Sequence, residues 1–477
     1  MDLLPVEILT QICEHLCFHC QNPGVFPHAD TAQVCDAKRA LARLCRTSKA
    51  ISAVAHPVLY HYYATGNLSV EELYSNGNYT RSLDRQHDFL TRFLHTIIVG
   101  RPELASHVVS MQLVCQYAFV SYTGLQPILD DLVDHEGKTR RWDVSGPTSN
   151  VWVFKEVHTW LWKLAIRSCP RLQSLLICCE NLAGPSDGIF PRDVRLPMLR
   201  TLGLHTGDCP IHFHDIGTLL HLGPNLEVFY LNGETGWLDG AAVSWSGDSP
   251  NLPKMRRMLI SGPDSPDQVY HLLKSVPSLE YLELYWLPNT WFTITSVLLE
   301  PVRKTLKSLR YSCLVRRPLG SRQPFWIQPS VESTDSRRTV AGTLRDFTAL
   351  EELSIDCRAL YRVGDQDEAD RLVSLLPSSI RSLRISYLFR GLQTSLRQLA
   401  QVAPAKFPRL KHVEIGVAEL TAPEHETSIA ETESLGARFR TSGIDFVWMT
   451  DLFSTNGRTL LPGASVGSSL VPVPGST

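Results

Sequence analysis

A short apolar pattern recurs along most of the chain. It consists of a proline, an apolar residue two positions later, a second three further on and an aliphatic residue two after that. Clear copies occupy residues 170–177, 197–204, 224–231, 253–260, 277–284 and 408–415, with weaker ones at 306–309, 350–355 and 380–385. The first apolar anchors are residues 172, 199, 226, 255, 279, 306, 350, 380 and 410, so most copies follow one another after 24 to 30 residues. A period of this length is typical of repeat proteins, in which each unit buries its apolar face against the next.

The spacing inside each copy predicts a short strand, and the segments between copies predict helices. Leu175 and Ile177 are two residues apart, so they lie on the same side of an extended chain. Apolar residues at helical spacing occur between copies, over residues 267–276, 365–376 and 394–403. Alternating strands and helices predict an α/β fold, a right-handed solenoid with a parallel sheet on its concave face.

The repeat resembles the leucine-rich-repeat family over about residues 104–450. That family usually has Asn or Cys three residues after the last anchor, where this chain has Glu180, Gly207 and Glu234. We therefore predict an irregular leucine-rich-repeat solenoid over residues 104–454. The one long step between copies contains an insertion rich in Arg, Pro and Ser, residues 316–338, which predicts a mobile loop. The Gly-, Ser- and Pro-rich residues 455–477 predict a disordered tail.

The first sixty residues follow a different pattern. Leu4, Ile8, Leu9, Ile12 and Leu16 form one apolar face of a helix over residues 5–16, with a proline in its first turn. Two more short amphipathic helices are predicted over residues 37–45 and 51–60, and Pro57 is expected to kink or end the last of them. Residues 17–36, between the first two helices, predict a loop. We therefore expect a helical domain over residues 1–62, followed by a helical linker over residues 63–103.

The opening residues 4–16 (LPVEILTQICEHL) and the later segments 41–49 and 54–60 resemble an F-box. The whole chain is similar to the F-box proteins with C-terminal leucine-rich repeats that filamentous fungi contain. The resemblance implies that the F-box binds a Skp-family adaptor, which joins a cullin ubiquitin ligase, while the repeats bind a protein substrate. By position, the adaptor-binding residues would be Leu4, Pro5, Ile8, Leu9, Ile12 and Leu44, although some of them must instead hold the helices together. The alternative is an interaction scaffold outside any ligase, in which the helices only cap the solenoid.

The residues between the buried anchors of each strand are expected to line the exposed, concave face of the sheet. Tyr and Arg among them are typical of binding surfaces, because they present a large contact area. The candidate substrate-binding residues are Tyr230, Arg257, Tyr281, Glu283, Tyr285, Arg310, Glu352 and Arg384.

Composition and charge narrow the class of protein. With 46 basic and 48 acidic residues the net charge is −2, without the basic excess that is usual in proteins that bind nucleic acid. No apolar run is long enough for a membrane span, and the opening residues do not read as a secretory signal. The 12 cysteines are too sparse for a disulfide scaffold. We expect reduced thiols in the cytoplasm, the nucleus or both, and partners that are proteins.

Three motifs contain residues suited to metal binding or catalysis, but none of these patterns is enough to predict such a site. Cys17 and Cys20 form a C-x-x-C pair near Cys13, Cys35, His15, His19 and His28, but a second tight pair of zinc ligands is absent, so we predict packed or loop thiols and no metal. The Cys209–Asp215 segment has ligand-type residues without a defined geometry. The Gly463–Gly467 segment matches a hydrolase G-x-S-x-G motif around Ser465 but lacks a strand before it and a helix after it. We predict no catalytic residue, no cofactor and no enzyme activity.

Overall fold

The computed structural model describes sixteen segments of the chain, separated by gaps. They are residues 4–21, 32–64, 89–116, 124–137, 142, 151–180, 194–207, 211–233, 237–238, 250–261, 266–286, 297–313, 343–360, 369–386, 392–416 and 429–449. They belong to two compact units, the first built from residues up to 209 together with 215–226, and the second from residues 210–214 and 227–457.

Four helices open the first unit: α1 (Val6–His15), α2 (Phe18–Gln21), α3 (Ala32–Leu44) and α4 (Lys49–Leu59). The Ser48 side chain accepts a hydrogen bond from the Ile51 backbone N–H at 3.2 Å and caps α4, which runs through Pro57 to Leu59. The predicted loop over residues 17–36 is wrong at both ends, because α2 and the first turn of α3 lie within it. Residues 22–31 of that segment lie outside the described residues.

The helices share one small apolar core. Its buried members are Leu9, Cys13, Cys17, Leu41, Ile51, Ala55, Val58 and Tyr62. The last of these belongs to a strand, β1 (Tyr62–Ala64), which pairs in parallel with β2 (Ser110–Gln116). The helical region is therefore continuous with the first strand of the sheet, which begins at residue 62 rather than in the predicted solenoid from residue 104.

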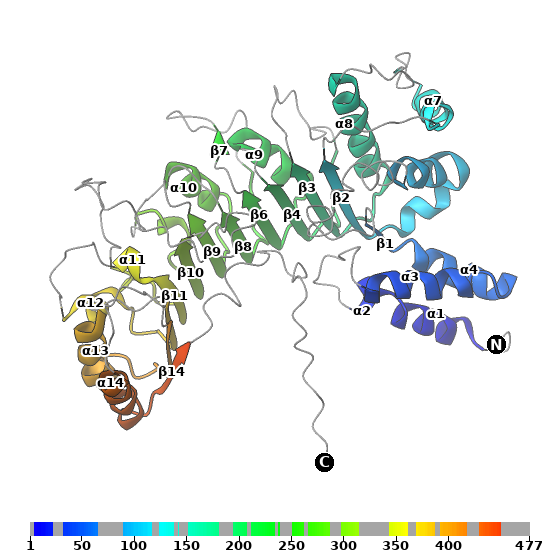
Figure 1. Cartoon of the computed structure of the whole chain (residues 1–477). Helices are drawn as coiled ribbons and strands as arrows, with labels where there is room; N and C mark the ends of the chain where they lie inside the picture. The colour runs from blue at the N-terminus through cyan, green and yellow to red at the C-terminus, as the bar shows by residue number, and fades with distance from the viewer. Residues whose placement is uncertain are drawn as a thin grey trace. The chain divides into compact units, whose positions relative to one another are not determined.

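The sheet has twelve strands in the order β1-β2-β3-β4-β6-β8-β9-β10-β11-β12-β13-β14, and every pair in the described register is parallel (Figure 1). The remaining strands of the first unit are β3 (Ser174–Glu180) and β4 (Thr201–Gly207). Those of the second unit are β6 (Val228–Gly233), β8 (Arg257–Ser261), β9 (Tyr281–Trp286), β10 (Ser308–Cys313), β11 (Glu352–Asp356), β12 (Ser382–Ser386), β13 (His412–Gly416) and β14 (Asp445–Met449). A separate pair is formed by β5 (Ile211–His212) and β7 (Trp237–Leu238).

Helices alternate with these strands, as the sequence predicts. Before β2 the chain forms a π-helix, η1 (Thr96–Gly100), and a 3₁₀ helix, η2 (Pro102–His107). After β2 it forms two α-helices, α7 (Gln126–His135) and α8 (Val151–Ser168). Later connections contain α9 (Phe213–Leu222), α10 (Pro266–Lys274), η3 (Glu300–Val302), α11 (Cys357–Leu360), α12 (Arg371–Leu375), α13 (Leu392–Lys406) and α14 (Ile429–Thr441). The fold is an α/β arrangement of strand and helix repeats around one all-parallel sheet, consistent with a leucine-rich-repeat-like solenoid.

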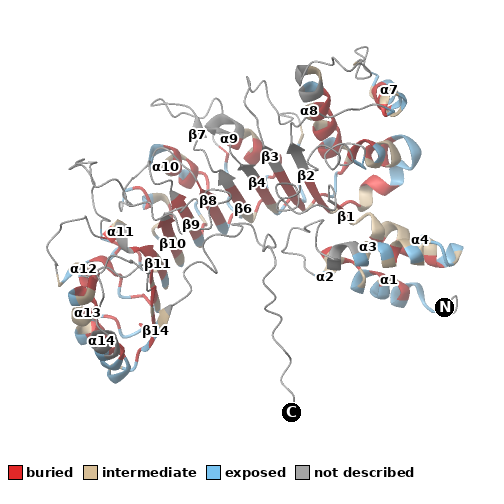
Figure 2. Ribbon diagram, in the orientation of Figure 1, coloured by how far each residue is buried: buried red, intermediate tan, exposed pale blue. Residues whose placement is uncertain are grey.

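The repeated anchors form the core. Leu282 pairs with Leu309 and Leu353 with Leu383, and all four are buried. Buried residues follow the strands in Figure 2. Each such leucine contributes about 1.5–3 kcal/mol relative to an exposed position, so the ladder of anchors is the main stabilising element of the repeats.

A backbone pattern links successive repeats. The carbonyl just before one strand accepts the N–H groups of two consecutive residues at the start of the next, as Gln173 does from Arg200 and Thr201 at 2.8 and 3.0 Å. The same double acceptor recurs at Glu227, Arg256, Glu280, Lys307, Glu351 and Arg381. The His61 carbonyl does the same for Val109 and Ser110, at 2.9 Å each. His61 is therefore the first member of the backbone pattern that builds the sheet.

The loop insertion 316–338 and the tail 455–477 lie outside the described residues. Among the helices that the structure describes, none combines the length and apolar character that crossing a bilayer requires.

Candidate functional site

A row of apolar side chains on α1 is exposed. Leu4, Ile8 and Ile12 are spaced by four residues and are 39%, 41% and 37% exposed. Ile8 and Ile12 lie on one face of α1, and Leu4 lies two residues before the first residue of the helix, Val6. Single exposed apolar residues are common on protein surfaces, but three this close together are a candidate contact surface. We call these three residues the α1 row.

The other predicted adaptor-binding residues divide between surface and core. Pro5 is exposed at the N-terminus of α1. Leu9 is only 6% exposed and lies in the helical core, so it is one of the predicted residues that hold the helices together. The helix α1 packs against α4, which supplies Ile51, Ala55 and Val58 to the same core. Leu44 is half-buried against the same core.

In the second unit, three predicted residues meet around the carboxylate of a fourth. Glu283 accepts a hydrogen bond from the Arg257 guanidinium at 3.0 Å and lies 3.8 Å from an Arg310 nitrogen. The Tyr285 hydroxyl donates to the same carboxylate at 3.1 Å, and the Arg310 guanidinium lies 5.7 Å from the centroid of the Tyr285 ring. The parallel register causes this, because it sets Glu283 of β9 directly opposite Arg310 of β10. We call Arg257, Glu283, Tyr285 and Arg310 the Glu283 cluster.

The other candidate residues lie on the same face of these strands, which we call the strand face, and they differ in how far they are exposed. Tyr281 is 42% exposed, as predicted. The predicted exposure is wrong for Tyr230 and Tyr285, which are 3% and 4% exposed, because arginines lie over this face of the sheet. Burial is also the main cause that raises the pKa of both phenols above the ordinary value for tyrosine.

Two further predicted residues pair with their neighbours on this face. Glu352 is exposed and accepts a hydrogen bond from the Ser308 hydroxyl at 3.1 Å. Arg384 lies 3.6 Å from the Glu414 carboxylate, its partner across the β12–β13 pair. Burial lowers the pKa of Arg384, with a further contribution from Arg310 and an opposing one from Glu414. The strand face is thus polar and largely charge-compensated by its own residues.

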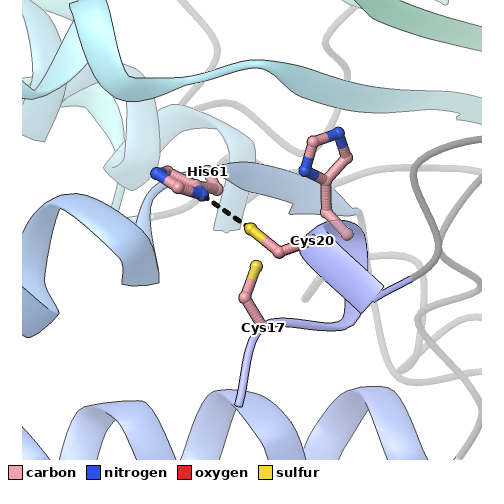
Figure 3. A group of neighbouring side chains, drawn as sticks. Cys17, Cys20 and His61 are labelled. Atoms are coloured by element: carbon pink, nitrogen blue, oxygen red, sulfur yellow. Dashed lines mark hydrogen bonds between the residues drawn. The ribbon is translucent and has the colours of Figure 1, made fainter. Parts of the chain in front are cut away.

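The structure also brings together four side chains with metal-ligating atoms: Cys17, His19, Cys20 and His61. One sulfur or ring nitrogen from each lies within 4.8 Å of the others, and this is the one such group in the described part of the chain. The first three come from the α1–α2 junction and α2, whereas the fourth comes from the segment between α4 and β1. Figure 3 shows the Cys17 and Cys20 sulfurs turned toward the His61 ring.

Burial and hydrogen bonding give this group an unusual environment. Cys17 is fully buried and His19 is 8% exposed, and the Cys20 sulfur lies 3.2 Å from His61 Nδ1. The hydrogen bond with Cys20 lowers the pKa of Cys17 against the opposing effect of burial, and His61 acts in the same direction as Cys20. The hydrogen bond with Cys17 and burial both raise the pKa of Cys20. Burial lowers the pKa of His19 and so favours its neutral, ligand-competent form.

The structure alters the set of ligands that the sequence suggested. Cys13 lies in the helical core and His15 is exposed; neither belongs to the group. His28 and the Cys35 side chain lie outside the described residues. His61 was missed, because it follows Cys20 by 41 residues and only the packing of α4 against α1 brings it near. No local spacing could have identified it.

The other two motifs are not tested. The side chains of the Cys209–Asp215 segment and the whole of Gly463–Gly467, with Ser465, lie outside the described residues.

Searches of this chain against models of known protein families and against curated proteins return no match. The resemblance to F-box and leucine-rich-repeat proteins therefore depends on the quoted motifs, and the structure adds the parallel sheet of repeats.

Proposed function

We propose that this protein is the substrate-recognition subunit of a cullin-type ubiquitin ligase, in which the N-terminal helices bind a Skp-family adaptor and the strand face binds a protein substrate. The observation that carries the proposal is the exposed α1 row, which lies within the segment that resembles an F-box. A helical region with one shared core and one uncovered apolar face has the surface that such docking requires.

The size of the α1 row fits a role in binding. Its three side chains are each about two-fifths exposed. Covering them would contribute on the order of 2–3 kcal/mol, since a fully buried aliphatic side chain is worth about 1.5–3 kcal/mol. This is enough to matter for affinity but not enough to account for a stable complex alone, so neighbouring residues such as Pro5 and Leu44 would have to contribute.

At the other end, the strand face offers polar groups held in fixed positions. Tyr281 supplies exposed aromatic area, and the Glu283 cluster supplies arginines that already have partners. Such preorganised side chains cost little conformational entropy on binding. The receptor would then act by proximity alone, raising the effective concentration of substrate lysines near a charged ubiquitin carrier.

A second candidate function is a scaffold outside any ligase, in which the helices serve as a cap. One observation favours it: Tyr62 belongs both to the helical core and to β1, so the helices do cover the first strand of the sheet. A cap and an adaptor-binding domain can coexist in one set of helices, and binding experiments separate the two functions.

The adaptor is tested directly by capture of the full-length protein with recombinant Skp-family adaptor. The double variant Ile8→Gln and Ile12→Gln keeps helix-forming residues but removes two members of the α1 row, and we expect capture to fall at least tenfold. The matched control is Val6→Gln, which changes a residue of α1 that is 62% exposed but lies off the row. If the unaltered protein is not captured, or if both variants bind equally well, the scaffold function is favoured instead.

The substrate face is tested with whichever protein is identified by affinity capture from a native source. Changing Tyr281 and Arg310 to Ala is expected to weaken binding of that purified substrate about tenfold, which corresponds to about 1.4 kcal/mol. Adaptor capture should stay unchanged, and Arg409→Ala, at an exposed turn before β13, should affect neither. Unchanged substrate affinity would place the substrate site elsewhere.

A further inference from the structure

We propose that Cys17, His19, Cys20 and His61 form a structural Zn²⁺ site that fastens the N-terminal helices to the first strand of the sheet. The inference does not depend on the proposed ligase function, because it concerns a bond between two parts of the first unit. It is carried by the convergence of four ligand-type atoms within 4.8 Å of one another from segments 41 residues apart.

The donor set suits zinc. Two thiolates with two imidazoles make one of the common four-ligand sets of structural zinc sites, and soft sulfur donors favour zinc over magnesium or calcium. Zinc–sulfur bonds of about 2.3 Å and zinc–nitrogen bonds of about 2.0–2.1 Å place tetrahedral ligands roughly 3.3–3.8 Å apart. The contact between Cys20 Sγ and His61 Nδ1, at 3.2 Å, is slightly shorter than this separation. The ligand atoms lie within 4.8 Å of one another, so a pair at that limit would have to close by about 1.0–1.5 Å.

A second observation points to a ligand. His19 is 8% exposed, and its Nδ1 atom has no hydrogen-bond partner among the described residues. A buried ring nitrogen without a hydrogen-bond partner destabilises the folded state unless something compensates for it. The His19 and His61 rings are close, with centroids 6.4 Å apart in an edge-to-face arrangement. A metal ion bound through His19 Nδ1 would satisfy that nitrogen.

The position of the group explains what such a site would do. Cys17 and Cys20 flank the start of α2, and His61 precedes β1 by one residue. The His61 carbonyl is also the first double acceptor of the backbone pattern, since it receives the N–H groups of Val109 and Ser110. A zinc ion there would hold the helices on the sheet through a residue in the short segment that joins α4 to β1. With four protein ligands the site is closed to water, which is typical of a structural rather than a catalytic zinc ion.

Two other states of the same side chains are possible outcomes. The cysteines are free thiols in the structure, and they could remain packed thiols or form a disulfide with each other. Either state leaves the buried His19 nitrogen without a partner, whereas the zinc site pairs it. This difference is why we favour the metal.

The test is metal analysis of the full-length protein, purified under reducing conditions without chelator from cells grown with added zinc. We expect one zinc per chain by mass spectrometry of the metal. The double variant Cys17→Ser and Cys20→Ser, and separately His61→Asn, should lose it. The matched control is Cys45→Ser, which changes a half-buried cysteine packed against the same helical core but outside the group. It should keep its zinc.

Two measurements on the unaltered protein do not depend on whether the variants fold. Replacement of zinc by Co²⁺ should give the visible absorption of a tetrahedral site with a thiolate-to-cobalt band. A strong chelator should release the metal, expose two additional reactive thiols and lower the melting temperature by several degrees. Absence of bound zinc, zinc retained in the double cysteine variant, or a Cys17–Cys20 disulfide found by peptide mass analysis under reducing purification would each overturn the proposal.

Discussion

The N-terminal helices and the strand face of the second unit were both expected to present binding residues, and they do so in opposite ways. The α1 row stays uncovered because the helices have one small core and Leu9 faces it, which leaves Leu4, Ile8 and Ile12 outside. On the strand face the side chains come from neighbouring parallel strands, so Glu283 finds its partners within the sheet. A helix face of this kind offers apolar area to a partner, whereas the strand face offers charges that are already paired.

The largest expected effect is the difference in stability between changing a buried and changing an exposed residue of α1. Leu9→Ala should destabilise the helical region by about 2–5 kcal/mol, because it opens a cavity in a core with few members. Ile8→Ala, one residue away but exposed, should change stability by less than about 0.5 kcal/mol. Two measurements distinguish the two variants: the chemical denaturation of each protein, and the hydrogen exchange of the backbone amides of α1 and α4. Equal losses would show that the α1 row is covered in solution.

A smaller effect is expected on the strand face, where it measures how far the charges compensate one another. Glu283→Gln removes the anionic partner of two arginines, and we expect a loss of about 1 kcal/mol, limited because the Arg257 side chain is 45% exposed. Glu414→Gln is the matched control, since it affects one arginine at 3.6 Å, and it should cost less. The difference in denaturation midpoint should shrink in high salt. A larger loss for Glu414→Gln would contradict the central position of Glu283.

The smallest effect concerns pH and is confined to the helical region. Burial lowers the pKa of His56 in α4 below its ordinary value of 6.5, and the neighbouring Arg101, whose guanidinium lies 2.7 Å from the ring, acts the same way, against an opposing effect of Glu103. The unfolded chain then binds more protons than the folded one as pH falls below 6.5. Stability contributed by neutral His56 is present above that pH and declines below it, by at most a few tenths of a kcal/mol because the residue is only half-buried.

The check is a pair of thermal melts at pH 7.5 and 5.5 on the unaltered protein and on His56→Gln. The variant should lose part of the pH dependence, while strand-face variants such as Glu283→Gln should keep it. A pH dependence that is identical in the unaltered protein and in His56→Gln would assign the effect to another group.

The sequence by itself determined the repeating elements. The side chains of a strand return to the same side every second residue and those of a helix about every 3.6 residues, so the spacing of the leucines predicts which of them face the core. The helix α10 lies where the helical spacing over residues 267–276 predicts one. The spacing of Ile8, Leu9 and Ile12 predicted the helix of α1 in the same way. The spacing of apolar residues is local information, and it can be read without knowing what packs against the helix or strand.

Only the tertiary structure decided which residues meet across separate segments. The burial of Tyr230 and Tyr285 depends on arginines from adjacent strands, and the position of His61 beside Cys20 depends on the packing of α4 against α1. Both depend on strand register and on chain segments that are distant in sequence, and neither produces a periodic pattern in the sequence. For that reason the Cys17–Cys20 pair looked incomplete as a sequence motif, and its remaining ligand-type partner became visible only when the fold brought it near.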